Sequence, residues 1–464
     1  MSVSQEPDTL LMLVGSYASA DQEGIKTYRF NQETGEAVLA STLSGIENPS
    51  FLVPTEDGTH VYAVGETEKG FTANALALDT LTAGLTLLNS QSTGGASPCY
   101  ITVSPDGKFV LTANYMGANI TVFPRLADGK LGEGHVISFQ GKGADKERQE
   151  QPHLHCVYFT PDGKLLLAND LGLDRIHAFP VKQTSGTKGT DLLDEAAAFD
   201  IELAPGSGPR HTCFDKQGKH AYLLTELSGE VVVWTYDGKT LTQQQVIKAD
   251  TVGAKGSADI HLSPDGKFLY ASNRLQADGV AIFKVSPSDG TLTKVGYQLT
   301  GIHPRNFTIT PNGKYLLVAC RDTNEIQVFA RDMETGLLQD IGKTIHTDKP
   351  VCLQWVMKSS NEPYTYTAGK IGGNGFLPRC ACTLICPPCR LIICLQRVRP
   401  IPEPLFLVVK KGTKIRFRHF RQHTFSVIAD FENEFLGMSF YLDANVRMGA
   451  MGTCFTGILQ QVYK

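Results

Sequence analysis

The sequence predicts an all-β protein built from repeated antiparallel sheets, and three observations lead to that prediction. The first is a tract with the plan Ser/Thr-Pro-Asp-Gly-Lys followed by two strands, which recurs at 104–123, 160–179 and 263–283. The second is the spacing of the turn glycines, which recur every 47 to 56 residues. The third is the content of the copies, which are β-rich and have no helical period.

Six copies of the turn are present, and weaker copies at 54–66, 215–234 and 310–329 complete the set with turn glycines Gly58, Gly107, Gly163, Gly218, Gly266 and Gly313. Each copy predicts a first strand, a turn with a positive-φ glycine, a second strand, a polar turn and a third strand ending in an aromatic residue. An antiparallel repeat of this length is typical of β-propeller blades, because each four-stranded sheet buries its faces against neighbouring blades.

Two half-units remain at the ends of the repeat region. Residues 10–30 match the second and third strands of a blade, and residues 349–356 match the first strand. Joining them makes a seventh blade and removes the free edges that an open ring would leave. We therefore predict a seven-bladed β-propeller over residues 1–357, with one blade closed by both chain ends.

Residues 358–464 differ from the propeller region in composition. They carry 14 Lys and Arg against 6 Asp and Glu, whereas the first 357 residues carry 29 against 41. Six of the eleven cysteines lie here, five of them in the tract CACTLICPPCRLIIC, whose spacing could ligate zinc. Zinc sites usually take pairs of ligands from separate knuckles, and the cysteines of this tract are not arranged in that way. The segment also contains no blade repeat. We therefore expect a Cys-rich basic extension of unknown structure, either disordered or of non-native origin, and no metal.

Polar residues recur at two positions counted from the turn glycine, and both positions are predicted to lie at one end of each hairpin. Eight residues before the glycine stand Ser50, Cys99, His155, Arg210, Ala258 and Arg305. Eight residues after it stand Glu66, Tyr115, Leu171, Glu226, Arg274 and Arg321. Four arginines, two glutamates and a histidine therefore converge on one mouth of the central channel. Such a density favours a functional site over rim charges that merely solvate the face.

The stretch GSGPRH, residues 206–211, introduces the most distinctive of these positions. Pro209 fixes its own φ and biases the preceding Gly208 towards an extended conformation, so Arg210 is expected at the start of a strand. Arg210 and Glu226 belong to one hairpin, and an ion pair between them is plausible. His155 has a near neighbour, His153, that could compete for the same role.

These residues resemble the lactonase family of seven-bladed propellers, which includes bacterial 6-phosphogluconolactonases and fungal carboxymuconate cyclases. The matching segments are HLHCVYFTPDG, GSGPRHTCFDKQGKHAYLLTELSGEVVVW, ADIHLSPDGKFLYASNRLQADGVAIF and HPRNFTITPNGKYLLVACRDTNEIQVF, and the likeness runs from about residue 10 to 357. The resemblance implies an active site of His155, Arg210, Glu226 and Arg274. It implies hydrolysis of a sugar lactone, with 6-phosphogluconolactone as the expected substrate.

Hydrolysis of a phosphorylated sugar lactone needs an activated water, donors for the developing oxyanion and cations for the substrate's phosphate. Glu226 or His155 is expected to act as general base, and Arg210 and Arg274 as oxyanion donors. Substrate binding is expected from His153, His211, Arg305 and Arg321. No metal or other cofactor is required. Two alternatives stay open: a cyclase or isomerase acting on a polycarboxylate such as carboxymuconate, and a non-catalytic propeller that binds a protein partner.

Composition excludes several other classes of function. An acidic propeller argues against a nucleic-acid-binding protein, which needs a continuous basic face. No apolar run is long enough to span a membrane, and the N-terminus has no signal-peptide pattern, so we expect a cytoplasmic protein without membrane contact. The G-x-S-x-G, Walker A and H-E-x-x-H motifs are missing from the sequence. The oligomeric state is not predicted by these observations.

Overall fold

The computed structural model describes residues 8–183 and 186–357 of the chain, together with five strands of the C-terminal segment. The chain divides into two compact units, Met1–Met357 and Lys358–Lys464. In the second unit β29 (Tyr364–Thr365) pairs with β30 (Thr383–Leu384). A three-stranded antiparallel sheet there consists of β31 (Lys414–Phe420), β32 (Thr424–Phe431) and β33 (Glu434–Tyr441). The five clustered cysteines lie outside the described residues.

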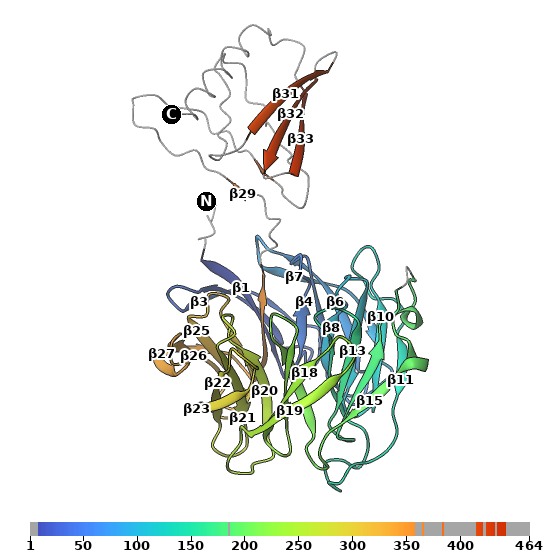
Figure 1. The fold of residues 1–464 in the computed structure, drawn as a ribbon, viewed down its shortest axis with the longest axis vertical. Coiled ribbons are helices and arrows are strands. Elements are labelled where there is room, and N and C mark those ends of the chain that lie inside the picture. Colours follow the sequence, from blue (N-terminus) through green and yellow to red (C-terminus); the bar gives the residue numbers. More distant parts are fainter. Residues whose placement is uncertain are drawn as a thin grey trace. The chain divides into compact units, whose positions relative to one another are not determined.

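The first unit contains seven four-stranded antiparallel sheets, so the predicted seven-bladed propeller is confirmed (Figure 1). Blade 1 consists of β28 (Pro350–Val356), β1 (Thr9–Ser16), β2 (Ile25–Asn31) and β3 (Glu36–Leu43). Blade 2 consists of β4 (Leu52–Pro54), β5 (His60–Gly65), β6 (Thr72–Asp79) and β7 (Gly84–Ser92). Blade 3 consists of β8 (Pro98–Val103), β9 (Phe109–Asn114), β10 (Asn119–Pro124) and β11 (His135–Ser138).

The remaining four blades follow the same order of strands. Blade 4 consists of β12 (Leu154–Phe159), β13 (Leu165–Asp170), β14 (Arg175–Pro180) and β15 (Phe199–Glu202). Blade 5 consists of β16 (Pro209–Phe214), β17 (His220–Thr225), β18 (Glu230–Tyr236) and β19 (Leu241–Lys248). Blade 6 consists of β20 (Ser257–Leu262), β21 (Phe268–Asn273), β22 (Gly279–Val285) and β23 (Leu292–Leu299). Blade 7 consists of β24 (Pro304–Ile309), β25 (Tyr315–Cys320), β26 (Glu325–Arg331) and β27 (Leu338–His346).

The ring closes through the first strands of the blades. These strands contact one another in the sequence β4, β8, β12, β16, β20, β24 and β28, and β28 returns to β4. Blade 1 is the closing blade, because β28 from the end of the propeller region pairs antiparallel with β1 from its start. The indole of Trp355 on β28 donates to the carbonyl of Ile309 on β24 over 2.9 Å, which ties blade 1 to blade 7. The two half-units therefore combine as the sequence predicts.

The repeated Pro-Asp-Gly turns owe their shape to both the glycine and the residue before the proline. All six turn glycines have positive φ, between 65° and 76°, a conformation that costs glycine little. The Ser104 hydroxyl donates to the Asp106 carboxylate over 2.6 Å and accepts the amide N–H of Phe109 over 2.9 Å. Side chains of this kind hold a turn by satisfying its free backbone groups.

The blades pack through apolar faces and through buried tyrosines. The aromatic residues that end the third strands of blades 3 to 7 are buried: Phe123, Phe179, Trp234, Phe283 and Phe329. Tyr222 on β17 donates its hydroxyl to the carbonyl of Gly290 in the next blade over 2.8 Å, and Tyr270 makes the corresponding 2.7 Å bond to Gly336. A buried tyrosine thus joins neighbouring blades without leaving its hydroxyl unsatisfied.

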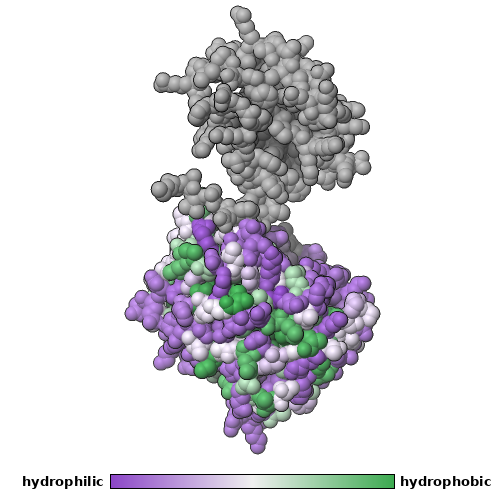
Figure 2. Space-filling model, turned by 90° about the vertical axis from the view of Figure 1, so that its left-hand side faces the viewer, coloured by the Kyte–Doolittle hydropathy of each residue, from purple (hydrophilic) through white to green (hydrophobic). Residues whose placement is uncertain are grey.

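Outside the blades, the described propeller region contains two short 3₁₀ turns, η1 (Gly189–Asp191) and η2 (Glu195–Ala197), in the connection before β15. The five cysteines of the propeller region form no disulfide. Figure 2 shows a side of the propeller that is mostly hydrophilic, with small hydrophobic patches scattered among the polar residues. No helix among the described residues is long and apolar enough to cross a membrane.

We expect a chain ending at Met357 to fold and to keep the propeller's thermal unfolding midpoint. A chain ending at Lys349 lacks β28, exposes the free edge of β1 and uncovers apolar faces of blade 1, and we expect it to aggregate. Soluble yield and thermal unfolding of the two shortened proteins, beside the full chain, measure the difference. If the chain that ends at Met357 is insoluble while the full chain is soluble, residues 358–464 are integral to the fold.

Candidate active site

The site is built on irregularities at the start of the inner strands. The register of β8, β12, β16, β20 and β24 against its neighbour shifts near the first residues of each strand. The residues left out of the ladders include Cys99, His155, Arg210, Ala258 and Arg305, the set that the turn-glycine spacing places at one mouth. Because a bulge releases a residue from the ladder and redirects its side chain, the bulges place these groups at the channel.

The turn before Arg210 differs from the expectation. Gly208 is not extended but has a φ of 67°, so the predicted bias from Pro209 is wrong at this position. The tertiary structure overrides it, because the N–H of Gly208 donates to Oδ1 of Asp174 over 2.8 Å and that of Gly206 donates to Oδ2 over 2.7 Å. A Cβ at Gly208 would lie 2.7 Å from Leu227. The turn is therefore a glycine-dependent loop clamped by one buried carboxylate.

Glu226 lies immediately after β17 and is surrounded by three arginines. Its Oε1 accepts a short hydrogen bond from Nη2 of Arg274, and its Oε2 accepts one of 3.2 Å from Nη2 of Arg148. Nε of Arg210 lies 3.9 Å from Oε1. Burial disfavours the charged carboxylate, but Arg274, Arg210 and Arg148 outweigh it and lower the pKa of Glu226 to about 2. Glu226 is therefore ionised at neutral pH and serves as counter-ion to the cluster.

Arg210 is fully buried, so it lies below the mouth rather than on its surface. Its Nη1 donates to the carbonyl of Ala258 over 2.7 Å, while Nε and Nη2 make no hydrogen bond to the described residues. Burial, followed by the charges of Arg274 and Arg305, lowers the pKa of Arg210 to about 9, and the group is still protonated at neutral pH. A buried guanidinium with two unused donors is a strong candidate for binding an anionic or oxyanionic ligand.

The two histidines of blade 4 have different surroundings. His153 is fully engaged, because its ring stacks on Tyr115 at 4.2 Å and its nitrogens meet the Tyr115 carbonyl and the Glu150 carboxylate, each at 3.0 Å. His155 is buried, and its Nδ1 has no hydrogen-bond partner among the described residues. Burial and the nearby Arg210 hold the pKa of His155 well below its usual range. His155 is therefore a neutral imidazole with a free nitrogen.

His211 lies in a layer of side chains across the channel. Its ring centroid is 5.2 Å from that of His155 and 5.3 Å from that of Tyr100. Its Nδ1 is 2.9 Å from Oδ1 of Asp259, and Asp259 in turn accepts the amide of Asn306 over 2.7 Å. Burial and Arg210 lower the pKa of His211 to about 4. Side chains from blades 3 to 7 thus fill the channel beside Arg210.

A second polar cluster occupies the mouth at blades 1, 2 and 7. The hydroxyl of Tyr17 donates to Oε2 of Glu66 over 3.0 Å, and Ser50 donates to the same oxygen. Nη2 of Arg305 lies 4.0 Å from Oε2 of Glu66. The guanidinium carbons of Arg305 and Arg321 lie 5.5 and 6.0 Å from the centre of the Tyr17 ring. Arg321 also forms a hydrogen bond of 2.7 Å to Asp322.

The structure brings most of the expected residues together. His155, Arg210, Glu226 and Arg274 lie in one cluster, His211 borders it, and His153 stands behind Tyr115. Arg305 and Arg321 belong to the second cluster. Four residues that line the two clusters were not selected from the sequence: Glu66, Tyr115, Tyr17 and Arg148. The first two stand at positions counted from the turn glycine, and the other two do not.

Arg148 carried no sequence signal, because it lies in the β11–β12 connection outside the repeat. This connection is held by the fully buried Gln149, whose amide donates to the carbonyl of Leu171 over 2.8 Å and to Asp174 over 2.7 Å. The anchor brings Arg148 over the start of blade 5, where it reaches Glu226. Such a position depends on how a long loop folds back, and no local pattern encodes it.

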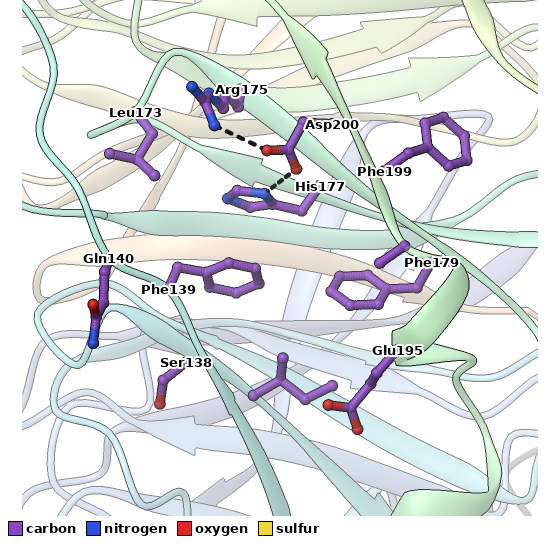
Figure 3. A pocket seen from close by; sticks show the side chains of 12 residues that line it. Ser138, Phe139, Gln140, Leu173, Arg175, His177, Phe179, Glu195, Phe199 and Asp200 are labelled. Carbon is purple, nitrogen blue, oxygen red and sulfur yellow. Dashed lines mark hydrogen bonds and ion pairs between the residues drawn. The ribbon is translucent and has the colours of Figure 1, made fainter.

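A separate pocket of about 610 Å³ opens between the outer strands of blades 3 and 4 (Figure 3). The imidazole of His177 stacks on Phe139 at 4.0 Å and lies between Asp200, at 2.6 Å, and Asp170, at 2.9 Å. Arg175 completes the row by donating to Asp200 over 3.0 Å. None of the eight predicted site residues lines this pocket. Within the described part of the chain, no group of three His, Cys, Asp or Glu is arranged to hold a metal ion.

The fold and this mouth define a class of protein, the single-chain β-propeller with a buried arginine–carboxylate site at one end of its channel. The family model described as Lactonase, 7-bladed beta-propeller matches residues 11–355, and the chain belongs to this family. The resemblance stated from the sequence is thereby confirmed.

Individual relatives agree with the family match. A 6-phosphogluconolactonase of Formosa agariphila is 37% identical over 353 residues, covering 74% of this chain and 98% of its own. That of Bacillus subtilis is 33% identical over 351 residues, covering 74% and 97%. The solved structure of the Pseudomonas aeruginosa periplasmic gluconolactonase is 31% identical with a TM-score of 0.70, covering 75% of this chain and 99% of its own. A solved Bacteroides fragilis structure reaches 56% identity and a TM-score of 0.73, covering 76% and 99%.

The lowered pKa of Glu226 predicts an acid-dependent loss of stability. A carboxylate whose folded-state pKa is lowered from 4.5 to about 2 stabilises the fold above pH 4.5 and loses that effect as the pH falls towards 2. We expect the wild type to exceed Glu226→Gln in free energy of unfolding by about 3 kcal/mol at pH 6, and the gap to close towards pH 2. Denaturant unfolding across this pH range measures it, with the exposed Glu68→Gln as control. A gap that stays constant with pH would contradict the assignment.

Proposed function

We propose that this protein hydrolyses a sugar δ-lactone, with 6-phosphogluconolactone as the substrate and 6-phosphogluconate as the product. Family membership and the names of the relatives support this reaction. The single structural observation that carries it is Arg210, a buried cation whose Nε and Nη2 have no hydrogen-bond partner among the described residues, beside the Glu226 counter-ion. Those donors suit an oxygen that gains negative charge during the reaction.

The proposed catalytic group consists of His155, Arg210, Glu226 and Arg274. Arg210 and Arg274 supply charge-assisted donors to the lactone carbonyl oxygen as the attacking water adds to its carbon. Glu226 fixes the two guanidinium groups, because it lies against both of them. His155, whose Nδ1 has no partner among the described residues, lies near enough to Arg210 for that charge to add to burial in lowering its pKa. The scheme uses only side chains of this chain.

Substrate binding is proposed for the residues around this group. Arg305 and Arg321 supply two cations on the side of blade 7. Their positive charge complements the negative charge of the phosphate on a phosphorylated lactone. His211 borders Arg210, with its Nε2 3.5 Å from Nη1, and His153 supports Tyr115 from behind. A role in the oxidative pentose phosphate pathway follows from the proposed reaction. The cytoplasmic location stays a prediction from the sequence.

The reaction is tested with freshly prepared 6-phosphogluconolactone, by following acid release above the spontaneous rate. We expect Arg210→Ala to lower kcat/KM by about 10²- to 10³-fold, the usual cost of one oxyanion donor. The matched control is Arg29→Ala on β2, because Arg29 pairs opposite Leu11 away from the end of β1 that leads to the mouth. Wild-type kcat/KM in Arg210→Ala would refute the assignment. Absence of acid release with the wild type, together with an absorbance change on a carboxymuconate, would favour a cyclase instead.

The phosphate role of Arg305 gives a separate prediction. We expect Arg305→Ala to raise KM for 6-phosphogluconolactone by about tenfold or more and to change KM for unphosphorylated gluconolactone much less, because a lost charge-assisted hydrogen bond costs on the order of 1.5–3 kcal/mol. Parallel kinetics with the two lactones measure the ratio. Equal effects on both substrates would show that Arg305 does not recognise the phosphate.

We also expect Glu226→Gln to lower kcat more than Arg305→Ala does, because Glu226 fixes both oxyanion donors.

A further inference from the structure

The mouth holds a second carboxylate, Glu66, to which the four-residue group proposed above assigns no role. Glu66 follows β5 in blade 2 and lies half-buried, with 17% of its side chain exposed. Its Oε2 accepts hydrogen bonds from the hydroxyls of Tyr17 and Ser50. No described residue donates a hydrogen bond to its Oε1. One carboxylate oxygen is thus held in place while the other is left available.

Glu226 is poorly suited to accept a proton from water. Both of its oxygens already accept from arginines, Oε1 from Arg274 and Oε2 from Arg148. The arginine charges that lower its pKa to about 2 also lower its affinity for a proton at neutral pH. A proton on either oxygen of Glu226 would neutralise the carboxylate and weaken its ion pairs with these arginines, so its geometry is that of a fixed counter-ion.

His155 is disfavoured for a related reason. Its Nδ1 is free, but protonation would add a third positive charge to a buried space that already contains Arg210 and Arg305. The pKa of His155 is accordingly held well below its usual range by burial and these cations. A base with so low a proton affinity is inefficient at neutral pH.

Glu66 differs from both groups in the cations around it. Arg305 is its one arginine partner, at 4.0 Å, compared with three arginines around Glu226. Its other two partners are neutral hydroxyls, because burial raises the pKa of Tyr17 above its usual value and keeps the phenol protonated. The carboxylate of Glu66 therefore has fewer cations against it than that of Glu226, and one of its oxygens has no donor among the described residues.

Arg305 connects the two clusters. Its Nη2 lies 4.0 Å from Oε2 of Glu66 and its guanidinium carbon 5.5 Å from the centre of the Tyr17 ring, while its charge adds to burial in lowering the pKa of Arg210 and Arg274. A lactone whose carbonyl oxygen meets Arg210 and Arg274 would therefore have both Arg305 and Glu66 along the same mouth. A water between the lactone carbon and Oε1 of Glu66 would be held by a carboxylate on one side and directed at a polarised carbonyl on the other.

We propose that Glu66 accepts the proton of the attacking water through Oε1, and that Tyr17 and Ser50 are positioning residues that hold its Oε2. This proposal rests on the lactonase function proposed above and identifies its general base. The oxygen of water bonds to the carbonyl carbon as one O–H bond breaks and its proton passes to Glu66. Collapse of the tetrahedral intermediate breaks the bond from that carbon to the ring oxygen, which takes the proton back from Glu66. The new carboxylic acid then ionises and releases one proton to solvent.

The test compares Glu66→Gln and Glu66→Asp with wild type, using initial rates on fresh 6-phosphogluconolactone near pH 6.5. We expect kcat of Glu66→Gln to fall by about 10²- to 10⁴-fold, the usual contribution of a positioned base. KM and the affinity for 6-phosphogluconate should stay within about threefold, because the amide is isosteric, its oxygen can still accept from Tyr17 and Ser50, and Arg305 keeps its contact with the Tyr17 ring. Glu66→Asp keeps a carboxylate and should lose less. The matched control is Glu68→Gln, an exposed glutamate two residues along the chain, which should retain wild-type kcat.

Two further measurements separate a proton acceptor from a structural group. Formate should raise kcat of Glu66→Ala and leave that of Glu68→Gln unchanged, because a small carboxylate can occupy the vacated space. Tyr17→Phe should lower kcat more than it raises KM. The Glu66 proposal is overturned if kcat of Glu66→Gln lies within threefold of wild type, or if its loss is matched by an equal loss of 6-phosphogluconate binding. A wild type without lactonase turnover overturns the proposed function and the role of Glu66 with it.

Discussion

Pairing of β28 with β1 is the interaction on which the rest of the structure depends. It joins strands from opposite ends of the propeller region into blade 1 and completes the ring of inner strands. The consequence reaches the site, because Tyr17 follows β1 directly and its amide donates to the carbonyl of Lys349, just before β28. Tyr17 then packs against Arg305 of blade 7 and binds Glu66 of blade 2. The second polar cluster therefore lies at the seam of the ring, and its geometry exists only when the ring is closed.

The first cluster shows how a propeller can bury several positive charges at one place. Desolvating a guanidinium is costly unless partners replace its water. Glu226 compensates Arg274, Arg148 and partly Arg210, and carbonyls of blade 6 accept from Arg210 and Arg274. The compensation is incomplete at Arg210, where Nε and Nη2 have no acceptor among the described residues. An anionic substrate would complete the set, so the same imbalance that weakens the free fold favours binding.

The two carboxylates of the mouth thus differ by environment rather than by chemistry. Glu226 is enclosed by arginines and is fixed as an anion. Glu66 is held by hydroxyls, with one arginine nearby and one oxygen open. Environments that differ in this way give like residues different tasks, here a counter-ion and a proposed proton acceptor. The arrangement also keeps Arg305 between them, where it can act on a substrate that spans both clusters.

The sequence by itself determined the number of blades, the turn chemistry and the end of the channel at which the polar residues gather. These features repeat, and each blade carries the pattern of turn glycine and strands within its own stretch of sequence, so the pattern can be recognised without knowing the contacts between blades. Spacing from the turn glycine was enough to place Arg210, Glu226 and Arg274 at one mouth. Only the tertiary structure decided the φ of Gly208, the bulges that redirect the inner-strand side chains, the depth of Arg210 and the arrival of Arg148 from a loop. Each of these depends on contacts between residues distant in sequence, such as Asp174 with the glycine turn and Gln149 with the loop, and such contacts leave no periodic trace along the chain.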